Sequence, residues 1–309
     1  MTAAGGRLAV LMATYNGARY IDEQLRSVDQ QAWPAIDVWA SDDGSTDGTS
    51  NALERWAVYW SKGAFTRLPG PGSGFAANFR SLLVNPEVDA DYVAFCDQDD
   101  VWLAEKTQVA VAALEPHGCR PALYCARTII TDAEGEELSR SPLFRRPPDF
   151  ANALVQNIGG GNTMVLNRAA HELVRKAAAL TDFVSHDWFA YLIVAGAGGY
   201  VTYDETPHVR YRQHGRNLVG SNQGWGPRLS RIKAAFGGRF MLWNDGNVAA
   251  LDACRDLLTP AAAEIFDRFR QARTGPLPDR LVNLWRSGVY RQTALGQVSL
   301  YAAGLLGKL

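Results

Sequence analysis

Residues 92–100 read Tyr-Val-Ala-Phe-Cys-Asp-Gln-Asp-Asp, an apolar run that ends in three carboxylates. The run over 92–96 predicts a buried strand, so the carboxylates are expected where this strand leaves its sheet. Carboxylate oxygens gathered at a sheet edge are natural ligands for Mg²⁺ or Mn²⁺, and a diphosphate can complete the coordination. This stretch therefore predicts a site for phosphorylated compounds at the edge of a sheet.

Strand and helix patterns alternate on both sides of this stretch. Strands are predicted over 8–15, 36–41, 65–68 and 92–96, and helices over 20–28, from about 49, and over 75–84. Such alternation predicts an α/β fold with a mainly parallel, Rossmann-like central sheet, flanking helices, and ligands at the carboxyl ends of the strands. Five polar side chains follow strands in this way and are expected on one rim: Tyr15, Asp42, Asp43, Asp97 and Asp99.

Size and cysteine spacing indicate a large folded protein with free thiols. The chain has 309 residues, of which 47% are hydrophobic, enough to bury a sizeable core. Its four cysteines show no C-x-x-C spacing, and its first residues lack the charged and then apolar pattern of a secretory leader. These features favour a cytoplasmic location, and a peripheral position on the cytoplasmic face of the inner membrane is left open.

Charge is unevenly distributed along the chain. Residues 206–309 contain fifteen Lys and Arg against six Asp and Glu, although the formal net charge of the whole chain is only −1. From about residue 227 the pattern is helical, with apolar residues approximating one stripe: Leu281, Leu284, Trp285, Val289, Val298, Tyr301 and Leu305. Contact with an anionic membrane and packing on the core or on a second subunit are both open for this segment.

Six motifs follow one another along the chain: ATYNG at 13–17, DDGSTD at 42–47, GFAANF at 74–79, DQDDVW at 97–102, HDW at 186–188 and YRQHGRN at 211–217. In this order they resemble the motifs of family 2 glycosyltransferases, most closely the rhamnosyltransferase-like branch. The resemblance implies the GT-A fold, a nucleotide-sugar donor, Mn²⁺ or Mg²⁺, and inversion at the anomeric carbon. We expect a GT-A domain over 1–225, with a nucleotide-sugar half to about 120 and an acceptor half to about 225, followed by a basic helical extension over 226–309.

Residues at the first two strand ends are candidates for binding the nucleotide base. Thr14, Tyr15 and Asn16 offer a ring and short polar groups that could stack on and hydrogen-bond a pyrimidine. By resemblance, Asp42 or Asp43 accepts a hydrogen bond from N3–H of the base. The alternative is that this acidic pair only shapes a turn.

Resemblance also implies roles for the acidic stretch itself. Asp97 would face the sugar or ribose, Asp99 would bind the metal, and Gln98 between them is a further candidate for binding the nucleotide-sugar. An acidic cap on a helix beginning near Trp102 is the alternative, and Asp100 is the residue best suited to it.

A general base and further ligands are implied by the later motifs. Asp187 matches the base position of the family at a predicted helix start, where a plain helix-terminal acid is the alternative. His214 would add a contact to the metal or diphosphate, which would favour manganese. Arg210, Arg212 and Arg216 lie beside it, and we take Arg212 as the candidate for binding diphosphate.

Two glycine-containing segments are expected near the same site. By resemblance, the segment through Asn78 borders the donor pocket. The triple glycine at 159–161 either forms the floor beneath donor and acceptor or is a flexible loop between strands.

The expected reaction is transfer of a sugar, with rhamnose from dTDP-rhamnose favoured, to a hydroxyl of a cell-envelope polysaccharide or lipid-linked glycan. A UDP-hexose-using transferase of the same fold is the main alternative. An inactive nucleotide-sugar-binding protein and a membrane-surface adaptor are further alternatives. Binding of nucleic acid is not expected, because no recognition motif accompanies the arginines, and a homo-oligomer is left open.

Overall fold

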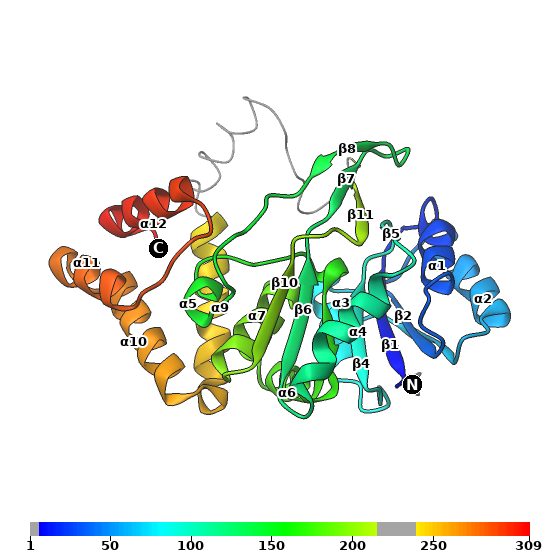
Figure 1. Ribbon diagram of the computed structural model, residues 1–309, viewed down its shortest axis with the longest axis horizontal. Helices are drawn as coiled ribbons and strands as arrows, with labels where there is room; N and C mark the ends of the chain where they lie inside the picture. Colours follow the sequence, from blue (N-terminus) through cyan, green and yellow to red (C-terminus); the bar gives the residue numbers. More distant parts are fainter. Residues whose placement is uncertain (1–5, 215–238) are drawn as a thin grey trace.

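The computed structural model describes residues 6–214 and 239–309. Its central feature is a seven-stranded sheet in the order β10-β6-β9-β4-β1-β2-β3 (Figure 1). The strands are β1 Leu8–Thr14, β2 Ile36–Asp42, β3 Phe65–Pro69, β4 Tyr92–Cys96, β6 Ala122–Ala126, β9 Val165–Asn167 and β10 Tyr200–Asp204. Only β9 runs antiparallel to its neighbours, so the predicted mainly parallel sheet is confirmed.

Strand register brings the predicted rim together. Thr14 at the end of β1 pairs with Asp42 at the end of β2, and Met12 pairs with Cys96 at the end of β4. The loops that follow β1, β2 and β4 therefore leave the sheet at one edge. This edge is the carboxyl end of the parallel strands, where α/β proteins of this kind bind ligands.

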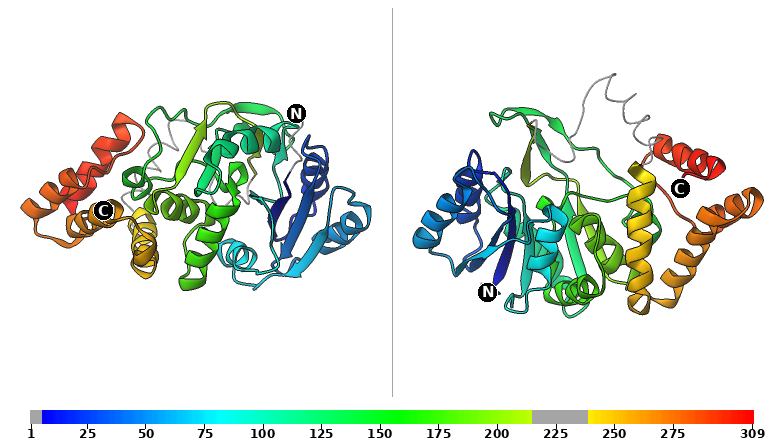
Figure 2. Two further views of the ribbon diagram at one scale, coloured as in Figure 1. Left: turned by 60° about the horizontal axis from the view of Figure 1, so that its bottom comes forward. Right: turned by 180° about the vertical axis from the view of Figure 1, so that it is seen from behind.

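Helices cover both faces of the sheet (Figures 1 and 2). One face packs against α1 Ile21–Asp29, α2 Thr49–Tyr59 and α4 Lys106–Leu114, and the other against α3 Phe75–Leu83, α6 Arg168–Leu180 and α7 His186–Gly196. Two separate apolar clusters result, one on each face, because alternate side chains of each strand point to opposite sides. A doubly covered sheet of this kind leaves its strand ends as the natural place for a site.

A second, four-stranded sheet adjoins this edge and was not predicted. Its order is β5-β11-β7-β8, with β5 Val101–Trp102, β7 Ile129–Thr131, β8 Glu137–Arg140 and β11 Val209–Arg212. The expected helix start near Trp102 is wrong, because β5 pairs with β11 there and the helix begins only at Lys106. Asp100 is consequently not a helix cap.

The C-terminal residues that the structure describes form helices at the end of the molecule opposite α1 and α2 (Figure 1). They are α9 Arg239–Ala253, α10 Pro260–Thr274, α11 Leu277–Arg286 and α12 Ala294–Leu306. Phe266 and Phe269 of α10 are buried in the same apolar cluster as α7 of the main body. The predicted single stripe is wrong, because Leu284 and Val289 are buried whereas Trp285 and Val298 are largely exposed.

Several predictions concern residues outside those described. Arg216 and the rest of the motif beyond His214 lie there, as do the expected boundary near 225 and the start of the helical pattern near 227. Across residues 6–214 and 239–309, no helix is long and apolar enough to cross a membrane. The four cysteines are all free thiols.

Candidate active site

The loop after β1 is held in place by the acidic loop after β4. The Tyr15 N–H donates to Gln98 Oε1 at 2.7 Å, and Gln98 Nε2 donates to the Tyr15 carbonyl at 2.9 Å. Asn16 adopts a left-handed conformation with φ 49°, and its Oδ1 accepts from the Thr46 N–H. These contacts leave the Tyr15 ring 60% exposed at the edge, where a planar group can stack on it.

Asp42 and Asp43 have different partners. The Asp42 carboxylate accepts from Thr14 Oγ1 at 2.9 Å and from the Ser45 hydroxyl. Asp43 accepts from the backbone N–H groups of Gly72 at 2.6 Å and Gly74 at 2.8 Å, so it fixes the loop that precedes α3. Asp43 thus shapes a loop, as the alternative for this pair supposed, while Asp42 faces an open cavity where a base could bind.

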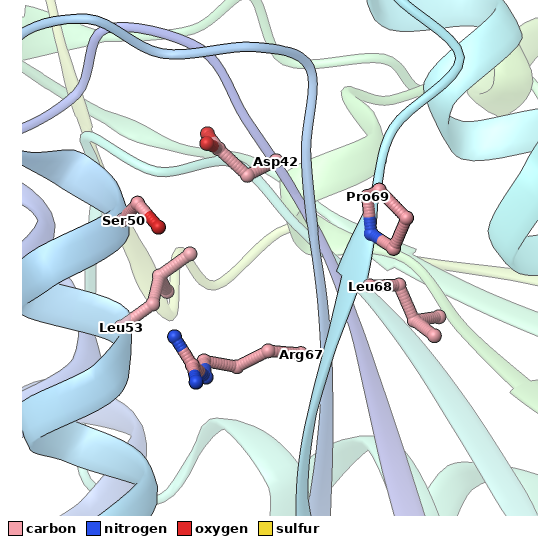
Figure 3. A pocket seen from close by; sticks show the side chains of 6 residues that line it. All are labelled: Asp42, Ser50, Leu53, Arg67, Leu68 and Pro69. Atoms are coloured by element: carbon pink, nitrogen blue, oxygen red, sulfur yellow. The ribbon is translucent and has the colours of Figure 1, made fainter.

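This cavity has a volume of about 340 Å³ and lies between α2 and the ends of β2 and β3 (Figure 3). It is lined by Asp42, Ser50, Leu53, Arg67, Leu68 and Pro69. Figure 3 shows the Arg67 side chain extending from β3 toward α2, below the Asp42 carboxylate. Sequence reasoning missed Arg67, and its only signal was a charged residue inside a short strand that ends at the same edge.

Asp99 and His214 meet although they are far apart in the sequence. His214 Nε2 lies 2.7 Å from Asp99 Oδ2, and both side chains are mostly buried. The imidazole also stacks on the Tyr20 ring with centroids 5.1 Å apart. A carboxylate oxygen and an imidazole nitrogen side by side are a donor pair suited to Mn²⁺ or Mg²⁺.

Asp97 is buried and close enough to Asp99 and Asp187 to be influenced by their charges. Loss of surrounding water, together with the negative charges of Asp99 and Asp187, raises the pKa of Asp97 to about 7. Three carboxylates close enough to influence one another in this way would be compensated by a bound cation. Within the described ranges no three His, Cys, Asp or Glu side chains form a complete metal cluster, so donor phosphates would have to supply further ligands.

Asp100 and Arg212 are buried and connect the loop after β4 to other parts of the site by hydrogen bonds. Asp100 is buried, accepts from Asn162 Nδ2 at 2.5 Å, and accepts from the Arg212 N–H at 3.1 Å. The guanidinium group of Arg212 donates to the Asp99 carbonyl and to Glu23, and lies over the Tyr20 ring. These contacts explain why Arg212 is only 3% exposed, and its contact with a diphosphate stays a prediction.

Asp187 lies in the first turn of α7 and accepts four hydrogen bonds. Its Oδ1 accepts from the Ser185 hydroxyl and from the Trp188 N–H at 2.7 Å. Its Oδ2 accepts from Asn157 Nδ2 at 2.8 Å and from the Gly161 N–H at 3.2 Å. These four donors fix the position of the carboxylate at the start of α7.

The triple glycine packs on His186 beside this carboxylate. A Cβ on Gly161 would lie 2.1 Å from His186 Nε2, so only glycine fits there. The imidazole is buried and stacked on Phe79 with centroids 3.6 Å apart, and burial lowers its pKa to about 4. Of the two interpretations of these glycines, a close-packed floor agrees better with this geometry than a loose loop.

Asn78 lies below the rim rather than on it. Its side chain is 1% exposed, and Nδ2 donates to the Ser41 carbonyl at 3.0 Å. The residue therefore braces the end of β2 against α3, and its direct contact with a donor stays a prediction.

Comparisons with known proteins agree with this architecture. The model of the family "Glycosyl transferase family 2" matches residues 9–173, more than half of the chain. The dTDP-rhamnosyl transferase RfbG of Shigella flexneri is 30% identical over 231 residues, covering 72% of this chain and 78% of RfbG. EpsE of Bacillus subtilis, described as a putative glycosyltransferase, is 28% identical over 114 residues, covering 37% of this chain and 40% of EpsE.

Solved structures show the same fold at low sequence identity. Staphylococcus aureus TarS, crystallised with UDP-GlcNAc, is 14% identical with a TM-score of 0.54, covering 98% of this chain and 88% of that one. The mannosyltransferase PcManGT of Pyrobaculum calidifontis, solved with GDP-Man and Mn²⁺, is 19% identical with a TM-score of 0.50, covering 99% and 86%. The chain therefore belongs to glycosyltransferase family 2, as a glycosyltransferase of the rhamnosyltransferase-like type with the GT-A fold.

Proposed function

We propose that this chain transfers rhamnose, with inversion, from dTDP-rhamnose to a hydroxyl of a cell-envelope polysaccharide or lipid-linked glycan. The similarity to RfbG carries the donor assignment, because it extends over most of both chains. A UDP-hexose-using transferase is the second candidate, favoured by the likeness to TarS, which was solved with UDP-GlcNAc. Thymine and uracil present the same N3–H, so Asp42 could accept from either base.

Donor binding would begin in the cavity of about 340 Å³ beside Asp42. Its volume lies at the lower end of the range for small-molecule sites. The exposed Tyr15 ring could stack on the base, and Arg67 could donate to a base carbonyl. The diphosphate would then point toward Asp99 and the donor sugar toward Asp97.

Asp99 and His214 would hold a divalent cation, which when bound would neutralise charge on the departing diphosphate. The residues fit this task because one oxygen and one nitrogen donor already face each other. Their two ligands are fewer than such an ion takes, so binding of metal and donor should be mutually dependent.

Asp187 would take the proton from the acceptor hydroxyl as it attacks the anomeric carbon. All of its lone pairs accept hydrogen bonds in this structure, so the acceptor must displace one donor. The Ser185 hydroxyl is the donor that can rotate away, because the other three are backbone or packed amide N–H groups. The acceptor hydroxyl would then occupy the place of the Ser185 hydroxyl.

Donor hydrolysis tests this proposal without knowledge of the acceptor. Release of dTDP from dTDP-rhamnose, and of UDP from UDP-glucose, would be measured with Mn²⁺, with donor binding followed by thermal shift. We expect Asp187→Asn to lower turnover by about 10²–10⁴-fold with donor binding retained. The matched control is Asp182→Asn, which changes a 94% exposed aspartate nearby and should leave both unchanged.

Each outcome has a definite meaning. Turnover retained in Asp187→Asn would exclude this residue as the base. Faster release from UDP-glucose than from dTDP-rhamnose would replace the first candidate with the second. No thermal shift with any dTDP or UDP compound would contradict the proposed donor site.

A further inference from the structure

Helix α12 is rich in apolar residues, yet only one side of it is covered. Its thirteen residues, Ala294–Leu306, include no charged side chain. The inner side carries the buried residues Leu300 and Gly304, and Gly304 packs directly on Leu284 of α11. A helix with this composition is normally buried on every side, so its outer side is expected to have an apolar partner.

The outer side presents four large aliphatic side chains to solvent. Leu295 is 77% exposed, Val298 67%, Leu305 53% and Leu306 59%. Their spacing places them within one half of the helix surface. All four retain more than half of their surface, so this side of α12 is an apolar face open to solvent.

One exposed aromatic residue and two exposed cations lie in the same C-terminal segment. Trp285 on the neighbouring helix α11 is 70% exposed. Residues 277–309 include four cations, Arg280, Arg286, Arg291 and Lys308, and a single acid, Asp279. Arg280 donates to the backbone carbonyls of Gly275 and Gly304, and burial lowers the pKa of Arg291 to about 10, so Arg286 and Lys308 are the exposed cations of this segment.

This combination fits the interface of a lipid bilayer. Tryptophan prefers the boundary between headgroups and acyl chains, and long basic side chains extend toward anionic headgroups. A helix of thirteen residues is roughly 20 Å long, shorter than the ~30 Å hydrocarbon core, so it would lie in the interface rather than span it. The excess of positive charge favours an anionic bilayer over a second copy of this chain, which would bring like charges together.

The position of α12 suits this role. Figure 1 and the right-hand view of Figure 2 show α12 and the small sheet β5-β11-β7-β8 both in the upper half of the molecule, with α12 at the end away from α1 and α2. A bilayer in contact with α12 would therefore hold the protein by its C-terminal end. An acceptor carried by a lipid of that bilayer would then be held close to the protein.

We propose that the outer face of α12, together with Trp285, docks the protein on an anionic lipid bilayer. Only the presentation of a lipid-linked acceptor rests on the proposed function, because the lipid contact depends on α11 and α12 alone. The lipid contact and the proposed transferase function can therefore be contradicted independently of each other.

Vesicle co-sedimentation tests the docking directly. The full chain would be mixed with vesicles of phosphatidylcholine, or of phosphatidylcholine containing phosphatidylglycerol, at low and high salt. We expect binding to the phosphatidylglycerol vesicles that weakens with salt, and about tenfold or greater loss of partitioning in Val298→Asp. The matched control is Val58→Asp, because Val58 is 76% exposed on α2 at the opposite end of the molecule.

A second variant and two further measurements keep the outcomes distinct. Leu305→Asp should reproduce the effect of Val298→Asp, with thermal melting of both variants close to that of the wild type because both positions are exposed. Absence of wild-type binding to phosphatidylglycerol vesicles, or an equal loss in Val58→Asp, would overturn the proposal. So would light scattering that shows a wild-type dimer dissociated by Val298→Asp, since the face would then belong to a second copy. Donor hydrolysis without vesicles should be unchanged in these variants, and its absence in the wild type would count against the proposed function only.

Discussion

Substitution of Gly161 by alanine should destabilise the protein through a collision with one identified side chain. A Cβ at this position would lie 2.1 Å from His186 Nε2, 2.9 Å from Cε1 and 3.0 Å from Cδ2. Favourable contacts between such atoms need about 3.5–4.0 Å, so the ring or the backbone must move by roughly 1.5 Å. His186 cannot yield easily, because it is stacked on Phe79 and meets the edge of Phe95.

The expected cost follows from this immobility. Overpacking of a buried site costs about 1–3 kcal/mol, and a contact this short in a fixed ring should lie at the upper end. For a chain of this size, 3 kcal/mol corresponds to a fall in melting temperature of roughly 5 °C. The Gly161 N–H also donates to Asp187, so displacement of this backbone should lower turnover as well.

A double-mutant cycle identifies the cause. Melting temperature and urea unfolding would be measured for Gly161→Ala, for His186→Ala, and for the double variant. Removal of the ring should relieve the collision, giving a coupling energy above about 1 kcal/mol in the favourable direction. A melting temperature for Gly161→Ala within error of the wild type, or costs that simply add in the double variant, would show that no collision with His186 occurs.

Three further changes test the chemistry of the core and the site. Asp99→Asn should weaken the Mn²⁺-dependent part of donor binding by more than about tenfold, as measured by titration calorimetry, and equal affinity with and without Mn²⁺ in the wild type would contradict this. Burial, together with the positive charges of nearby Arg175 and Arg168, lowers the pKa of His171 to about 4. Between pH 6.5 and pH 4 the unfolded chain therefore binds a proton at His171 that the folded chain does not bind. Stability should therefore fall as the pH falls through this window, and His171→Leu should reduce the loss by up to about 3 kcal/mol in urea titrations. Burial likewise lowers the pKa of Lys106 to about 7, so the folded protein pays for the buried charge below pH 7. Lys106→Met should therefore raise the free energy of unfolding by about 2–5 kcal/mol below pH 7, and this gain should shrink toward pH 10.5. A gain in stability that does not depend on pH would exclude the buried charge as its cause.

Local pattern accounted for most of the elements around the site. The apolar run before Asp97 and the run that ends at Thr14 are buried strands, and the alternation of strands with helices predicted parallel neighbours. The carboxyl ends of parallel neighbours share one edge of a sheet, so a common rim could be predicted from the sequence alone. The ordered motifs added the family, which the comparisons confirm.

The sequence pattern could not predict which of two neighbouring carboxylates faces the site. Asp99 and Asp100 are adjacent and chemically identical, yet one faces His214 while the other is buried against Asn162. Asp42 and Asp43 separate in the same way, between an open cavity and a backbone loop. Which way each side chain points depends on residues that approach from distant parts of the chain.

Local signals in the chain were sufficient to predict strands, helices, turns and the shared edge that parallel pairing imposes. The pairing of β5 with β11, the place of Arg67 in the cavity beside Asp42, the contact of His186 with Gly161 and the exposed apolar side of α12 became visible only in the folded molecule. The difference lies in the distance along the chain over which each kind of signal acts. Hydrophobic period and turn chemistry act between residues a few positions apart, whereas these contacts join segments whose proximity depends on how the whole sheet and its covering helices pack.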